Sequence, residues 1–138
     1  MLALSTPYST LRGRRVLIVE NEQLIALDLS EVLAEEGADV MATKTSVSAA
    51  LAALTYEQAP DVALLDVSLD DNEPVFAVAD ELQQRHIPFV FYTGYRPVDG
   101  RGRFHDVNYY EKPMDSRTLA AALGDALHAS LGSMASNH

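Results

Sequence analysis

The chain has 138 residues, no cysteine and a formal net charge of −10 at pH 7. This length supports one domain with its own hydrophobic core, and we expect no second domain. The lack of cysteine excludes disulfides, zinc–thiolate sites and cysteine nucleophiles. The acidic charge, with Lys44 and Lys112 as the only lysines, argues against a face that binds nucleic acid.

No segment has the pattern of a membrane helix or a signal peptide. The apolar runs are far shorter than a membrane span, and Met1–Leu4 is too short for the core of a signal sequence. We therefore expect a cytoplasmic protein with no membrane partner. Residues 1–13 are polar and rich in turn-forming residues, which predicts a flexible arm. The domain is then expected at 14–131, followed by a flexible tail at 132–138.

Five short segments have the apolar composition of β-strands. The clearest, Val62–Leu65, is continuously apolar and ends in Asp66, a pattern typical of a parallel strand covered by helices on both faces. The expected strands are Val16–Val19, Asp39–Thr43, Val62–Asp66, Phe89–Tyr92 and Val107–Glu111.

Helical patterns separate these strands. Gly37 is expected to end the first helix, Ser46 to cap a second that runs through Leu54, and Pro74 to begin a third that ends at Arg85. The last helix is expected to start near Asp115 and Ser116. Apolar stripes mark the first and last helices: Ile25, Leu29, Val32 and Leu33 in one, Leu119, Leu123, Leu127 and Leu131 in the other.

The alternation of strands and helices predicts an α/β fold. Right-handed crossovers between parallel strands lead to a flavodoxin-like, doubly wound, five-stranded sheet of order 2-1-3-4-5, with helices on both faces. The exception is the segment between residues 95 and 106, where Gly100, Gly102 and Pro97 disfavour a regular helix. The fourth helix is therefore expected to be short or disordered.

Polar side chains follow four of the expected strands, at the end where open parallel sheets hold their chemistry. In the order 2-1-3-4-5 these side chains converge: Glu20, Asn21, Asp66, Thr93 and Lys112. Carboxylates, a hydroxyl and a lysine suit a hard cation together with a phosphoryl group. An ionised Asp66 is then the candidate nucleophile, giving an aspartyl phosphate. The alternative is that Asp66 only caps the turn after its strand.

These motifs resemble the receiver domain of two-component response regulators, over Arg14 to Leu131. The resemblance implies that Asp66 accepts a phosphoryl group from a histidine kinase, and that Lys112 pairs with it and with the phosphoryl oxygens. It implies a cis peptide between Lys112 and Pro113. It also implies switch roles for Thr93, which would hydrogen-bond the phosphate, and for Tyr109.

The resemblance further implies a Mg²⁺ site made by Glu20, Asn21, Asp66 and the backbone carbonyl of Ser68. Asn21 departs from the family, which usually has an acidic residue at this position. A neutral amide ligand next to a divalent cation predicts Mg²⁺ binding that is real but weaker, by roughly tens of times. Glu22 lies nearby and is a further candidate ligand.

The sequence from Phe91 to Tyr95 resembles a receiver subgroup with the motif Phe-Ala-Thr-Gly and a following tyrosine. That subgroup has a reduced fourth helix, and it includes stand-alone regulators that work with HWE or HisKA2-type kinases. We expect phosphorylation to order residues 95–106, with Arg96 or Arg101 contacting the phosphate. The partners implied are a sensor histidine kinase or phosphotransfer protein and a downstream protein that the sequence does not identify.

Three interpretations fit the sequence. The first is a single-domain response regulator, a phosphoryl acceptor rather than an enzyme, that signals through protein–protein interaction. The second is a receiver-like interaction module that works without phosphorylation, which Asn21 favours. The third is a flavodoxin-like cofactor protein or small hydrolase, but the acidic segment Glu20–Glu22 disfavours an anionic flavin phosphate and no nucleophile elbow is visible. The four histidines show no catalytic or metal-binding spacing, and we expect them on the surface or in the tail.

Overall fold

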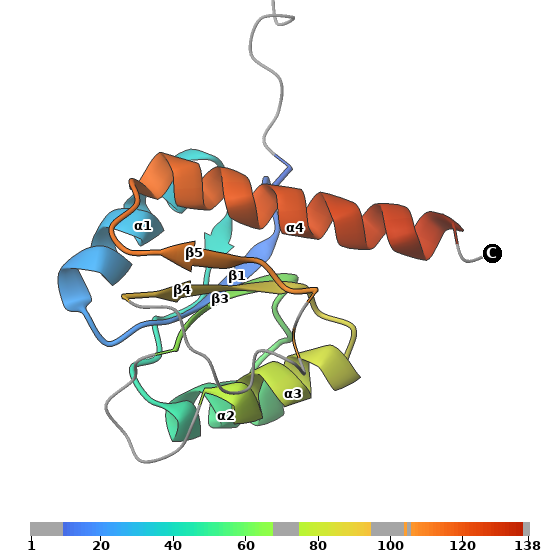
Figure 1. Ribbon diagram of the computed structural model, residues 1–138, viewed down its shortest axis with the longest axis horizontal. Helices are drawn as coiled ribbons and strands as arrows, with labels where there is room; N and C mark the ends of the chain where they lie inside the picture. The colour runs from blue at the N-terminus through green and yellow to red at the C-terminus, as the bar shows by residue number, and fades with distance from the viewer. Residues whose placement is uncertain (1–9, 68–74, 95–103, 105, 137–138) are drawn as a thin grey trace, which may run out of the picture.

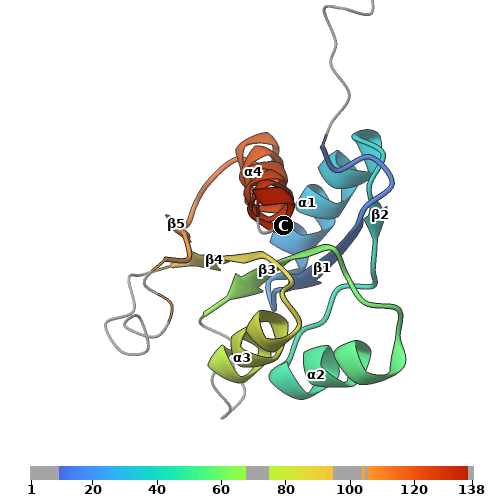
Figure 2. The ribbon, with the colours of Figure 1, turned by 90° about the vertical axis from the view of Figure 1, so that its right-hand side faces the viewer.

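A computed structural model describes residues 10–67, 75–94, 104 and 106–136 of the protein. Five parallel strands form one sheet in the order β2-β1-β3-β4-β5. This order, seen edge-on in Figure 2, confirms the predicted topology. The strands are β1 (Arg15–Val19), β2 (Asp39–Val40), β3 (Val62–Asp66), β4 (Phe89–Thr93) and β5 (Tyr109–Glu111).

Helices cover both faces of the sheet, as expected for a doubly wound fold. In Figures 1 and 2, α1 and α4 lie on one face, and α2 and α3 lie on the other. The helices are α1 (Gln23–Glu35), α2 (Val47–Tyr56), α3 (Phe76–Gln84) and α4 (Ser116–Ser136).

The central strands are buried on both sides because successive residues point into opposite layers. Along β3, Val62 and Leu64 pack with α1 and α4, whereas Ala63 and Leu65 pack with α2 and α3. Each layer therefore has its own apolar cluster. This arrangement accounts for strands that are continuously apolar rather than alternating.

Two local signals from the sequence are confirmed. The Ser46 hydroxyl accepts a hydrogen bond from the Ala49 backbone N–H at 3.1 Å and caps α2. Gly37 has a φ of +90° at the end of α1, and a β-carbon there would lie 3.2 Å from Cγ of Arg12. Glycine is favoured at this position by both its backbone angle and the close approach of Arg12.

Several predicted boundaries are wrong by a few residues. β5 begins at Tyr109 rather than Val107, and β2 ends at Val40. The last helix continues through Gly132 to Ser136, beyond the glycine after which the tail was expected to begin. Leu131 is 38% exposed and does not continue the buried stripe of Leu119, Leu123 and Leu127. The expected start of α3 at Pro74 and the fourth helix expected within 95–106 fall largely outside the described residues.

Two residues assigned to irregular segments belong to the core. Leu11, placed in the flexible arm by its sequence context, is fully buried in the α1–α4 layer near Gly124 of α4. Phe104 is fully buried in the other layer, against Phe76, Phe89 and Phe91, with ring centroids 5.6–6.0 Å apart. Each side chain packs into the apolar layer on one face of the sheet. In the described parts of the chain, no helix is long and apolar enough to span a membrane.

We expect Leu11→Ala to lower the free energy of unfolding by about 2–4 kcal/mol, because it leaves a cavity in a closed core. Leu24→Ala is the matched control, since Leu24 is 81% exposed and its truncation should cost under about 0.5 kcal/mol. Urea unfolding of the two variants and the wild type measures both values. Equal midpoints for the two variants would contradict the burial of Leu11.

Candidate functional site

The register of the sheet brings the predicted site residues to one edge. Val19 pairs with Leu65, so Glu20, directly after β1, lies level with Asp66, the last residue of the neighbouring β3. The backbone N–H of Lys112 donates to the Thr93 carbonyl at 2.8 Å, which places the lysine beside the end of β4. The expected convergence is confirmed for Glu20, Asp66, Thr93 and Lys112.

Lys112 is the centre of this site because its ammonium group contacts three carboxylates. Its Nζ lies 2.6 Å from Glu22, 3.1 Å from Glu20 and 3.2 Å from Asp66. Glu20 and Asp66 are fully buried, whereas the Glu22 side chain is 58% exposed. An aspartate that only capped a turn would not need this buried ion pair.

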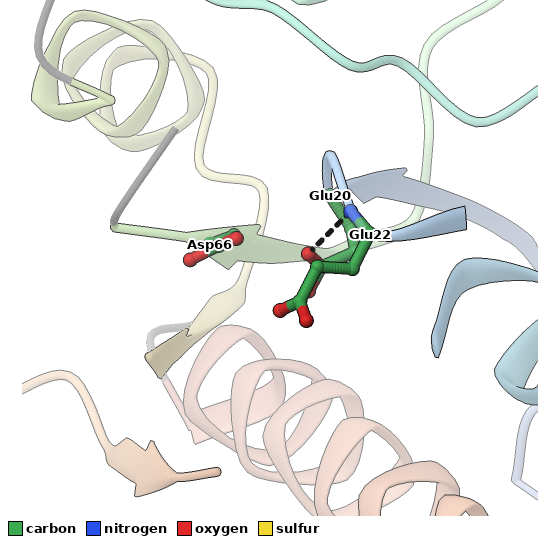
Figure 3. A group of neighbouring side chains, drawn as sticks. All are labelled: Glu20, Glu22 and Asp66. Atoms are coloured by element: carbon green, nitrogen blue, oxygen red, sulfur yellow. Dashed lines mark hydrogen bonds between the residues drawn. The ribbon is translucent and has the colours of Figure 1, made fainter. Parts of the chain in front are cut away.

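The three carboxylates form an acidic cluster at the ends of β1 and β3 (Figure 3). One oxygen from each of Glu20, Glu22 and Asp66 lies within 4.8 Å of the others, close enough for a single metal ion. The backbone N–H of Glu22 donates to Oε2 of Glu20 at 3.0 Å, which fixes the turn that leads from β1 into α1. Oxygen ligands of this kind suit Mg²⁺.

Asn21 and Ser68 are the two other predicted metal ligands. Asn21 is half-buried between Glu20 and Glu22 in the chain, and it contributes no carboxylate to the cluster. The third carboxylate comes from Glu22, which the sequence offered only as a further candidate. Ser68 lies outside the described residues.

The close carboxylates shift the proton equilibria of the site. Burial, together with the hydrogen bond and negative charge of Asp66, raises the pKa of Glu20 to about 7. For Lys112, burial works against the charged form, but the hydrogen bonds and charges of the carboxylates outweigh it and raise the pKa. Lys112 is therefore charged at neutral pH, whereas Glu20 gains or loses its proton near neutral pH.

Tyr92 supports Lys112 in a way that the sequence did not indicate. Its hydroxyl accepts a hydrogen bond from the Met114 backbone N–H at 2.8 Å and donates to the Met114 carbonyl at 3.3 Å. Its ring lies 5.5 Å from the Lys112 Nζ, within range of a cation–π contact. The Lys112–Pro113 peptide is cis, as the family resemblance implied.

The remaining predicted residues are placed as follows. Thr93 is buried at the end of β4. The Tyr109 ring is half-buried and stacks on Phe91 with a centroid distance of 4.6 Å. Among the described histidines, His86 and His128 are exposed, as expected.

A five-stranded doubly wound sheet with a buried aspartate, an acidic cluster and a lysine at one edge has the architecture of a receiver domain. Comparison with known proteins confirms this class: the response regulator receiver domain family matches residues 16–124. The chain therefore belongs to that family, whose members are signalling proteins rather than enzymes and work with a phosphodonor and an effector protein.

Its relatives include the transcriptional regulatory protein PdtaR of Mycobacterium tuberculosis, 31% identical over 80% of this chain and 55% of PdtaR. The phyllosphere-induced regulator PhyR of Methylorubrum extorquens is 29% identical over 81% of this chain and 43% of PhyR. The chain thus spans about half the length of these relatives. The solution structure of SdrG from Sphingomonas melonis Fr1 is 36% identical, with 89% of this chain and 98% of SdrG covered and a TM-score of 0.69.

The raised pKa of Glu20 predicts a pH-dependent stability in metal-free solution. The folded state holds this proton up to about pH 7, whereas the ordinary pKa is 4.5, so the folded state binds more protons between these values. The free energy of unfolding should therefore fall as pH rises from about 4.5 through 7, by at most about 1.4 kcal/mol per pH unit.

Urea unfolding in EDTA between pH 5 and 8 tests this expectation against Glu20→Gln. The variant lacks the titrating group, so its stability should change less over this range than that of the wild type. Parallel curves for the two proteins would show that Glu20 does not carry the proton.

Proposed function

We propose that this chain is a response regulator that accepts a phosphoryl group on Asp66 from a histidine kinase. The observation that supports this most directly is the fully buried Asp66 carboxylate, held 3.2 Å from the Lys112 ammonium beside two further carboxylates. A cation next to a buried nucleophile offsets the negative charge that a phosphoryl group brings.

The proposed nucleophile in this transfer is the carboxylate of Asp66. A carboxylate oxygen of Asp66 attacks phosphorus, the bond from phosphorus to the donor's imidazole nitrogen breaks, and that nitrogen keeps the electron pair. The product is an acyl phosphate. Lys112 is proposed to donate a hydrogen bond to a phosphoryl oxygen, and Thr93 is proposed to do so after transfer.

Mg²⁺ is the proposed cofactor, with Glu20, Asp66, Asn21 and the carbonyl of Ser68 as ligands. When bound, it neutralises charge on the phosphoryl oxygens during transfer. The chemistry of the donor set fits this ion, because all of these ligands are oxygens. Glu22 adds a carboxylate near the same point, but it is exposed and already bound to Lys112. Mg²⁺ should therefore bind more weakly than at a site with a second acidic residue after β1.

The proposed output is a protein–protein interaction made by the phosphorylated form in the cytoplasm, with Tyr109 as the switch residue. This role is supported by the half-buried ring of Tyr109, which stacks on Phe91, two residues before Thr93 in β4. An HWE or HisKA2-type kinase as phosphodonor and ordering of residues 95–106 remain part of this proposal. The second candidate, an interaction module that works without phosphorylation, is favoured by Asn21 alone.

Intact-protein mass spectrometry after incubation with phosphoramidate should show one phosphoryl adduct on the wild type. The adduct should require Mg²⁺, because the acidic cluster repels an anionic donor when no divalent cation is present. Asp66→Ala should give none. An adduct that persists in Asp66→Ala would place the acceptor elsewhere, and no adduct on the wild type would favour the phosphorylation-independent module.

Asn21→Asp should tighten Mg²⁺ binding by about tenfold or more, because it adds a full charge beside the cation. Isothermal titration calorimetry measures the dissociation constants of the variant and the wild type. Asn108→Asp is the matched control, since it adds the same charge just before β5, whereas the site lies beyond the other end of that strand. A wild type that shows no Mg²⁺ response into the high millimolar range would contradict the metal site.

A further inference from the structure

Glu22 differs from the other two carboxylates that surround Lys112. It makes the shortest of the three contacts, at 2.6 Å, yet its side chain is 58% exposed, whereas Glu20 and Asp66 are fully buried. It is the N-cap residue of α1, and its side chain makes no capping hydrogen bond to that helix. Its side chain can therefore move away from the lysine into water without disturbing the core.

We propose that Glu22 is a positioning residue that holds Lys112 before phosphorylation and releases it to the phosphoryl group. This inference rests on the proposed phosphorylation of Asp66. In this proposal, Glu22 binds the Lys112 ammonium group rather than the metal ion, and so restrains the lysine before phosphorylation.

The number of donors on Lys112 carries the argument. An ammonium group has three N–H donors, and the three carboxylates use all of them in the resting protein. A phosphoryl oxygen needs one of these donors, so one carboxylate must leave. Glu22 is the partner that regains full hydration on leaving, because the other two are closed off from water.

In this proposal, phosphorylation breaks the contact between Lys112 and Glu22. Removing the charge of Glu22 should weaken the resting contact and leave the lysine freer to meet the phosphoryl group. An ion pair that is half-exposed contributes little, so the expected gain in rate is roughly two- to fivefold. The same change should leave the affinity for Mg²⁺ unaltered, since Glu22 is not assigned to the metal.

The test compares Glu22→Gln with Glu31→Gln, an equal change of charge at an exposed position of α1 that makes no contact with Lys112. Mass spectrometry follows adduct formation from phosphoramidate over a range of Mg²⁺ concentrations. The plateau rate reports the transfer step, and the half-saturating Mg²⁺ concentration reports metal binding. Urea unfolding of both variants confirms that they fold.

We expect Glu22→Gln to raise the plateau rate two- to fivefold with the half-saturating Mg²⁺ concentration unchanged, and Glu31→Gln to match the wild type. An unchanged or lower plateau with a higher half-saturating concentration would overturn the inference and make Glu22 a metal ligand. An equal gain in both variants would overturn it in favour of a general charge effect. A wild type without any adduct would instead overturn the proposed function, and this inference with it.

Discussion

The site depends on one constraint, which is that a single ammonium group serves three carboxylates at the ends of parallel strands. The pairing of β1 with β3 brings Glu20 and Asp66 together. The pairing of β4 with β5 places Lys112 beside them. Carboxylates at this spacing repel one another unless a cation or a proton intervenes. Here the cation is the ammonium group of Lys112. The raised pKa of Glu20 further lowers the negative charge, because Glu20 is partly protonated near neutral pH.

Sequence reasoning found most of this site because the direction of a parallel strand determines where its last residue lies. Asp66, Glu20 and Lys112 each follow an apolar run, and the strand order then brings them together. Tyr92 escaped notice for the opposite reason, since a tyrosine within an apolar run indicates a core residue. Only the packed structure shows its hydroxyl on the Met114 backbone. Periodicity carries no information about which polar atom of a buried side chain finds a partner.

The limits of the elements were harder to predict than their order. Leu11 and Phe104 lie in segments rich in turn-forming residues, so composition placed them outside the core. Each is buried because it fills space that the sheet and helices leave open, which is a property of the assembled layers. Leu131 shows the converse error: helical spacing predicts a shared face but does not reveal where the layer beneath that face ends.

The helix α4 is long enough to extend well away from the site. Its first turn follows directly after Met114, which Tyr92 ties to the site, while its last residues run past the strands in Figure 1. At about 1.5 Å per residue, the stretch from Leu127 to Ser136 projects by roughly 13 Å, so a tilt of about 5° would carry its tip by about 1 Å. A small tilt of α4 beside Met114 therefore produces a larger displacement at the C-terminal end of the helix.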